Sequence, residues 1–366
     1  MQIIEFADGT LRFLERMPEN APPNGFIWIF TDRASFVAES PVLQAAAQAL
    51  GGSPLLDLHL KDLANSDHPS HYDYTSIYDL VIFRRLATDA ETREESVVSA
   101  KPPRSTLAAF QRIATLAVGF IVFDRLLITV HPDGCYAANT FIQRYLQDAV
   151  HNEGLSTSAR SRLPSSPADL MLRMLNLIVD SYLDLRTVLS SELDRWQQQL
   201  LAPGSREADW SALMSARRAL HKLEGLCEGQ NDAMLEWLDT QREQPAPWMP
   251  QAERDTLLAR ARDVVEHIQR VQRHVHRMEQ GAETAVQIHF SVIGHRTNEI
   301  MRVLTALTAV FLPLNFLTGF FGMNFEFLPL IHSPHAMWLT FALMAGIGIG
   351  VLLVFWRMRY IARVGK

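Results

Sequence analysis

A row of mostly polar or glycine residues recurs at steps of three and four in an otherwise apolar stretch near the C-terminus. Its members are Asn298, Met301, Thr305, Thr308, Leu312, Asn315, Gly319 and Gly322. Residues at this spacing share one face of a helix, so the pattern predicts a polar stripe along an apolar helix. Amide and hydroxyl groups can hydrogen-bond the water shell of a cation, and the stripe therefore predicts a pore lining. Close packing between membrane helices is the alternative, since Thr, Gly and Asn are common contacts there.

Two uncharged, mostly apolar stretches lie near the C-terminus, and the first contains most of this stripe. Residues 303–325 form a run of 23 residues and residues 336–356 a run of 21. A helix crosses a hydrocarbon core of roughly 30 Å with about 20 residues. The sequence thus predicts a pore-lining transmembrane helix at 303–325, an outer loop at 326–335, a second transmembrane helix at 336–356 and a basic cytosolic tail at 357–366.

Basic residues near the two stretches predict their orientation. The second stretch is followed by Arg357, Arg359, Arg363 and Lys366, and the first is preceded by Arg296 and Arg302. The loop between them carries Glu326 and no basic side chain except histidine. The positive-inside rule then places both termini in the cytoplasm of a multi-pass protein of the inner (plasma) membrane. The charged N-terminus lacks the apolar core of a cleavable signal peptide.

The residues before the membrane segments predict an α+β cytosolic body. Strand-like apolar runs occur at 26–30, 78–83, 118–123 and 125–130, and a helix at 42–50 ends at Gly51-Gly52. We therefore expect an α/β domain over residues 1–165.

Helical periodicity dominates the next region, residues 166–302. It predicts one helix from Asp169 to Leu200 and a second from Asp209 to Leu238. From Ala252 the chain contains no proline until Pro313, so we expect a stalk helix that continues into the first membrane span. A helix from there to Met323 is about 105 Å long.

Composition and histidine spacing narrow the classes of function. The net charge of −6 gives no support to a nucleic-acid partner, and two cysteines form no disulfide framework. Four histidines of the first domain show no zinc-ligand or triad spacing, so we expect no enzyme: His59, His68, His71 and His131. The stalk carries His267, His274, His276, His289 and His295, which lie on mixed faces. A structural or solvent-facing role is favoured over a zinc relay for these histidines.

Two motifs give the chain a family resemblance. The first membrane stretch ends in Gly322-Met323-Asn324, and residues 297–329, TNEIMRVLTALTAVFLPLNFLTGFFGMNFEFLP, are similar to the signature of the CorA-type divalent-cation transporters. In the stalk, Arg262-Asp263-Val264 followed by Glu266-His267 is similar to a second element of that superfamily. The superfamily includes a magnesium branch, CorA, and a zinc branch, ZntB.

The resemblance implies a funnel-shaped homopentamer with one central pore for a divalent cation. It implies a selectivity mouth at Gly322, Met323, Asn324 and Glu326 and a hydrophobic gate at Met301 and Leu304. It further implies a regulatory metal site to which Asp263 contributes, with Asp89 as a candidate partner. The implied cation is Mg²⁺, as cargo and as regulator, and an uncharged pore suits an ion that keeps most of its waters.

Departures from the family pattern leave other functions open. Leu330 replaces a usual loop acid, Leu312 a common pore methionine and Asn315 a common pore threonine, while Glu326 is retained. Zinc, cobalt or nickel transport of the ZntB type is therefore an alternative to magnesium. A different class also fits the hairpin, namely a cytosolic binding or scaffold protein that the hairpin anchors to the bilayer.

Overall fold

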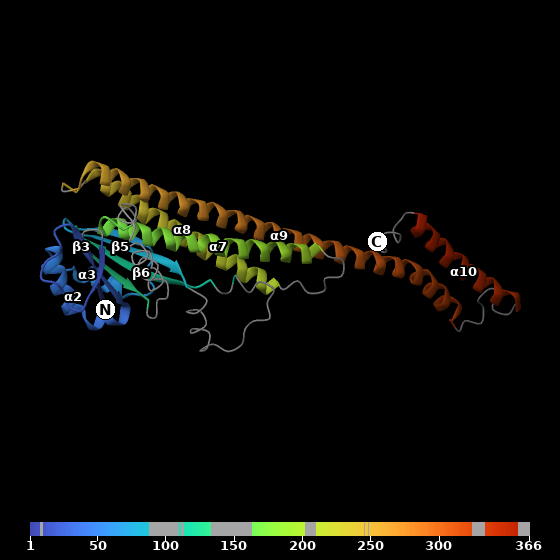
Figure 1. Cartoon of the computed structure of the whole chain (residues 1–366). Helices are drawn as coiled ribbons and strands as arrows, with labels where there is room; N and C mark the ends of the chain where they lie inside the picture. The colour runs from blue at the N-terminus through green and yellow to red at the C-terminus, as the bar shows by residue number, and fades with distance from the viewer. Residues whose placement is uncertain are drawn as a thin grey trace. The chain divides into compact units, whose positions relative to one another are not determined.

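The computed structural model describes residues 1–7, 10–87, 110, 113–132, 163–201, 210–244, 246–247, 249–323 and 334–357 (Figure 1). It comprises two compact units, Met1–Glu283 and Thr284–Lys366. Four residues singled out above lie outside the described ranges: Asp89, Asn324, Glu326 and Leu330. The basic tail after Arg357 also lies outside them.

A seven-stranded sheet forms the centre of the first unit, with the strand order β2-β1-β3-β7-β6-β5-β4. The strands are β1 Gln2–Ala7, β2 Thr10–Leu14, β3 Gly25–Asp32, β4 His71–Tyr74, β5 Asp79–Leu86, β6 Thr115–Val122 and β7 Leu126–His131. Neighbours are antiparallel except β3 and β7, which are parallel. The four predicted strands are confirmed as β3, β5, β6 and β7, whereas β1, β2 and β4 were not predicted.

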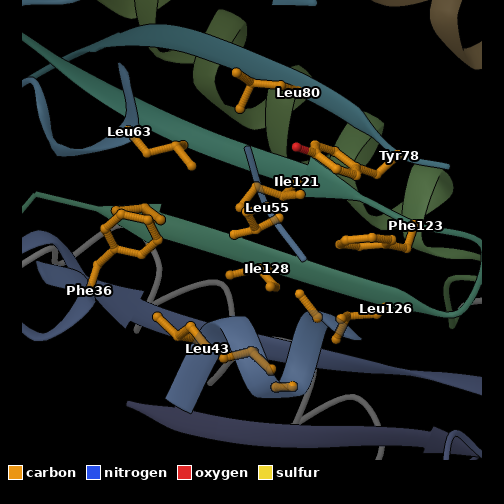
Figure 2. Packing of buried hydrophobic residues seen from close by; sticks show 14 of the residues in the cluster. Phe36, Leu43, Leu55, Leu63, Tyr78, Leu80, Ile121, Phe123, Leu126 and Ile128 are labelled. Atoms are coloured by element: carbon orange, nitrogen blue, oxygen red, sulfur yellow. The ribbon is translucent and has the colours of Figure 1, made fainter. Parts of the chain in front are cut away.

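One face of the sheet packs against short helices. These are α1 Arg33–Ala38, α2 Ser40–Ala46, the π-helical turn η1 Ala47–Gly51 and α3 Asp57–Ala64. Strand residues alternate between faces, so Leu80 and Ile128 point into this core, which Phe36 and Leu43 of the helices also line (Figure 2). The helix predicted at 42–50 is confirmed by α2 and η1. It ends at Gly52, whose φ of 87° lies in the left-handed region that glycine adopts without strain.

The other face of the sheet packs against two long helices, α7 Pro167–Leu201 and α8 Trp210–Glu243. Polar contacts fix both helices to β5. The hydroxyl of Tyr182 on α7 donates to the carbonyl of Arg84 at 3.1 Å, and Gln230 Nε2 on α8 donates to the same oxygen at 2.6 Å. Both helices confirm the sequence prediction to within a few residues at their described ends.

The helix α9 runs unbroken from Gln251 to Phe321, which confirms the predicted continuous stalk helix. In the first unit it packs with α7 and α8 through buried residues at alternating steps of three and four. On α9 they are Ala261, Val264, Ile268, Val271, Val275, Met278 and Ala282, and on α8 Ala216, Leu220, Leu223, Cys227, Gln230, Met234 and Trp237. These heptads are typical of coiled-coil packing. The helices α7 and α8 cover the apolar residues of α9, between which its histidines and arginines lie.

The second unit contains the C-terminal part of α9 and the helix α10, Pro334–Arg357. Both helices are long and apolar enough to cross a membrane, and almost none of the residues in their most apolar segments is buried within the chain. Phe316 and Trp338, for example, are each 71% exposed. Such surfaces need lipid or other protein to cover them.

Candidate ion pathway and metal-binding residues

The predicted pore seam occupies one exposed face of α9 in the second unit. Every one of its eight members is exposed. The hydroxyl of Thr305 donates to the carbonyl of Met301 at 2.7 Å, and that of Thr308 donates to the carbonyl of Leu304 at 2.9 Å. Each hydroxyl thus donates its proton to a hydrogen bond within the helix. Its oxygen keeps a lone pair that can accept a hydrogen bond from water.

Of the two residues predicted as a gate, Met301 belongs to this seam and Leu304 lies beside it. Met301 and Leu304 are one turn apart, and their side chains are about half exposed. A shallow surface depression is lined by Leu304, Thr305, Thr308, Ala309 and Leu312. The apolar side chains therefore adjoin the hydroxyl-bearing part of the seam, as a hydrophobic constriction in a polar path requires.

The helix α9 ends at the first residues of the predicted mouth. Gly322 N–H donates to the carbonyl of Thr318 at 2.9 Å, and Met323 N–H donates to that of Phe320 at 3.4 Å. A Cβ atom at Gly322 would lie 2.8 Å from the oxygen of Thr318, closer than real Cβ atoms approach. Glycine is therefore required by this turn. The other two mouth residues, Asn324 and Glu326, lie outside the described residues.

Asp263 lies in a small group of charged side chains in the first unit. Its Oδ1 is 3.7 Å from Nε2 of His267, whose Nδ1 is 3.5 Å from Oδ1 of Asp180 on α7. The Asp263 side chain is 58% exposed, so one side of its carboxylate remains open to solvent or a partner. Its candidate partner Asp89 is not described.

The exposed positions of α9 share one heptad numbering in both units. In the first unit, the residues on the side away from the buried heptad are Asp263, Glu266, Arg270, Arg273, Arg277 and Gln280, all exposed. Every residue of the pore seam in the second unit lies a multiple of seven positions after Asp263 or Glu266.

A second cluster of metal-ligating side chains was missed by the sequence analysis. His221 and Glu224 of α8 and Glu279 of α9 offer ligand atoms that all lie within 4.8 Å of one another, and His276 of α9 adjoins this group through Glu224. His276 Nδ1 lies 3.1 Å from Oε1 of Glu224. Contact with Glu279 lowers the pKa of Glu224, and the same contact raises the pKa of Glu279. The sequence signal was the pattern His-x-x-Glu in both helices, whereas the prediction considered single histidines.

The histidines of the first domain make the local contacts expected of structural residues. His59 is buried, with Nδ1 2.8 Å from the hydroxyl of Tyr78 and Nε2 3.1 Å from Asp73. Burial lowers the pKa of His131 to about 3, so this side chain is neutral at physiological pH.

Comparison with known proteins connects this geometry to one family. The family model described as "CorA-like Mg2+ transporter protein" matches residues 38–357. The cobalt/magnesium transport protein CorA of Methanocaldococcus jannaschii is 24% identical over 249 residues, which cover 68% of this chain and 73% of that protein.

Solved structures show the same fold over nearly the whole chain. The complete structure of the CorA magnesium transporter from Methanocaldococcus jannaschii superimposes with a TM-score of 0.73 at 18% identity and covers 98% of both chains. The structure of the full-length CmaX protein gives a TM-score of 0.66 at 18% identity, with 98% of this chain and 97% of that chain covered.

Proposed function

Because the chain belongs to the CorA-like Mg²⁺ transporter family, we propose that it conducts Mg²⁺ across a membrane through a pore formed by five copies. Membership makes the chain a membrane transporter of divalent cations and not an enzyme. The finer proposal concerns the cation, the pore residues and the assembly. It rests chiefly on one observation, the exposed polar seam of α9.

The seam supports a pore between copies of the chain. One pair of membrane helices cannot enclose an aqueous path, so repeated copies must supply the walls. A seam facing a symmetry axis would remove its Asn, Thr and Gly residues from lipid, where polar groups are costly. The apolar side chains on the other faces would then contact lipid and α10. The number five comes from the family resemblance.

The absence of charged side chains along the seam suits a hydrated cation. Mg²⁺ dehydrates reluctantly and keeps several waters in its protein sites. Hydroxyl and amide oxygens can accept hydrogen bonds from those waters without displacing them. In this proposal Asn324 contacts the hydrated ion at the mouth, beside Gly322, Met323 and Glu326, and Met301 and Leu304 close the inner end by excluding water.

Orientation and regulation complete the proposal. Both termini lie in the cytoplasm, as the basic residues around the two spans predict. Cytosolic Mg²⁺ binds at Asp263 between neighbouring copies and favours the closed state. A divalent ion between two carboxylates replaces repulsion by attraction, so losing it would favour separation of the copies.

Transport itself can be tested with purified protein in liposomes that contain a magnesium-sensitive dye. We expect Mg²⁺-dependent signals well above those of empty vesicles. Parallel uptake of Zn²⁺, Co²⁺ and Ni²⁺, with and without a pH gradient, separates the magnesium proposal from transition-metal transport of the ZntB type. Protein that inserts but carries none of these ions would favour a membrane-anchored binding protein.

The assembly requires a separate measurement. Mass determination of the detergent-solubilised protein should give five chains per particle. A stable monomer or dimer would contradict the pore model, because too few copies would then surround the seam.

A further inference from the structure

Two copies of the pattern His-x-x-Glu face each other in the cytosolic unit. They are His221 with Glu224 on α8, and His276 with Glu279 on α9. We propose that these four side chains bind one transition-metal ion of the Zn²⁺ class within each chain and thereby link α8 to α9. The site is separate from both the pore seam and Asp263.

Helix register brings the two patterns together. Each of the four residues directly follows a buried heptad residue, so all four flank the apolar contact between α8 and α9. As the residue number rises along α8, the number of the contacting residue on α9 falls. Thus His221 approaches Glu279 and Glu224 approaches His276, as expected for antiparallel helices. The bond from Gln269 Nε2 to Asn231 Oδ1, 3.3 Å long, follows the same register further along.

The distances between donor atoms fit a small metal ion. Ligand atoms about 2.0–2.2 Å from a tetrahedral Zn²⁺ are about 3.3–3.6 Å apart. His276 Nδ1 is 3.1 Å from Glu224 Oε1, and His221 Nδ1 is 3.8 Å from Glu279 Oε1 and 3.9 Å from Glu224 Oε2. One ligand atom from each of His221, Glu224 and Glu279 lies within 4.8 Å of the others. His276 is not part of this group of three, so coordination of one ion by all four residues requires side-chain rotations that bring His276 to the same point.

The donor set selects the class of metal. Two imidazoles and two carboxylates suit Zn²⁺ and neighbouring transition metals, whereas Mg²⁺ prefers oxygen ligands and water. The side chains of Glu224 and Glu279 are 20% and 23% exposed, compared with 58% for Asp263. The two glutamate side chains also contact each other. Two carboxylates in contact repel each other unless they share a proton or bind a cation. A bound metal ion would compensate the charge of both carboxylates.

A neighbouring amide can orient one of the ligands. Nε2 of His276 lies 3.0 Å from Nε2 of Gln280, one turn further along α9. A metal ion on Nδ1 requires a proton on Nε2, and turning the Gln280 amide by half a turn places its oxygen to accept that proton. Hydrogen bonds of this kind fix the tautomer and direction of metal-ligating histidines.

The alternative is an ordinary cluster of paired side chains at the edge of a helix contact. Such flanking His–Glu pairs occur without metal in helical bundles, and the exposed His221 is compatible with that explanation. The two explanations differ in stoichiometry, since only the metal site binds an additional ion per chain with a specific coordination geometry.

Metal binding by the full-length protein in detergent tests the proposal. Metal-stripped protein is titrated with Zn²⁺ by calorimetry and with Co²⁺ by visible absorption, where four-coordinate Co²⁺ absorbs strongly. We compare the wild type with Glu224→Gln, with His276→Ala and with the double variant His221→Ala/Glu279→Gln. His295→Ala is the matched control, because it removes an exposed histidine of the same helix outside the cluster.

We expect the wild type and His295→Ala to bind one more Zn²⁺ per chain than the double variant. Each single variant should bind that ion about tenfold or more weakly, since even outer-shell changes cost that much. The strong cobalt absorption should disappear with it, while circular dichroism stays unchanged. Equal stoichiometry, affinity and cobalt spectra in all proteins would overturn the proposal. Transport does not enter this measurement, so a failure of the transport assay leaves its result unaffected.

Discussion

The indole Nε1 of Trp237 on α8 donates a hydrogen bond of 3.1 Å to Oδ2 of Asp79, the first residue of β5. Gln241 Nε2 donates to the same oxygen at 2.9 Å, and the Tyr72 hydroxyl lies 3.3 Å from Oδ1. A partly buried carboxyl group thus connects the sheet to the helix that packs with α9. Burial raises the pKa of Asp79 to about 6, from an ordinary value of 3.8, although its hydrogen bonds oppose that change.

The raised pKa of Asp79 predicts a pH-dependent stability. The folded protein holds this proton more tightly than the unfolded chain, so protonation stabilises the fold fully below pH 4 and the gain is lost as the pH rises through 6. A pKa change of this size corresponds to about 3 kcal/mol. We expect Asp79→Asn, which is neutral at every pH, to remove this dependence between pH 4 and 7. Melting temperatures of both proteins in one detergent, measured across that range, provide the comparison, and parallel pH profiles would contradict the assignment.

The mouth residues can be tested through their side chains and backbone. We expect Asn324→Ala to abolish Mg²⁺ uptake because it removes the amide oxygen that we propose contacts the hydrated ion. Gly322→Ala should have the same effect for a different reason, since the added methyl group must displace the carbonyl of Thr318. The readout is dye-monitored uptake by liposomes with equal amounts of protein.

Gly348→Ala on α10 is the matched control for Gly322→Ala. No atom other than those of its own helix turn and its chain neighbours lies within 4 Å of a Cβ at Gly348, so the methyl group should be tolerated. Normal uptake by both mouth variants would show that the mouth lies elsewhere.

The gate prediction concerns leak through the closed pore. Met301→Ala and Leu304→Ala would widen the proposed apolar constriction, so water should enter and uptake at high internal Mg²⁺ should rise severalfold. Val303→Ala shortens an exposed side chain on the opposite face of the same helix turn and should leave this leak unchanged. Dye-monitored flux at saturating internal Mg²⁺ measures the effect. Equal leak in all four proteins would mean that these residues do not close the path.

Regulation by cytosolic metal is predicted to depend on Asp263. Its carboxylate faces His267 on one side and is exposed on the other, so Asp263→Ala should remove a ligand with little change in packing. We expect the internal Mg²⁺ concentration that half-inhibits uptake to increase about tenfold or more, with maximal uptake retained.

Asp255→Ala is the control for charge alone. Asp255 is an exposed acid of α9 eight residues before Asp263, and its carboxylate accepts a hydrogen bond from Gln251 on its own helix. Asp255→Ala removes one negative charge, as Asp263→Ala does, but removes no predicted metal ligand. Inhibition of Asp263→Ala at the wild-type concentration would exclude this residue from regulation.

Local patterns in the sequence predicted the elements that a short stretch of chain determines. The two apolar runs are long enough to span a membrane, and the structure has helices α9 and α10 there. The absence of proline from Ala252 to Leu312 predicted the long helix, because backbone hydrogen bonds could continue without interruption. The pore seam was likewise visible, since residues on one helix face are fixed by spacing alone. Its role in transport stays a prediction.

Contacts between distant segments were decided by the tertiary structure. The strands β1, β2 and β4 are short or partly exposed, so their pattern is weak without their neighbours in the sheet. Asp79 looks like any charged residue before a strand, and only the packing of α8 buries it beside Trp237. His221 and Glu279 are 58 positions apart, and only the antiparallel register of α8 and α9 brings them together. Spacing along one helix determines which residues share a face, whereas the opposing face depends on how helices pack.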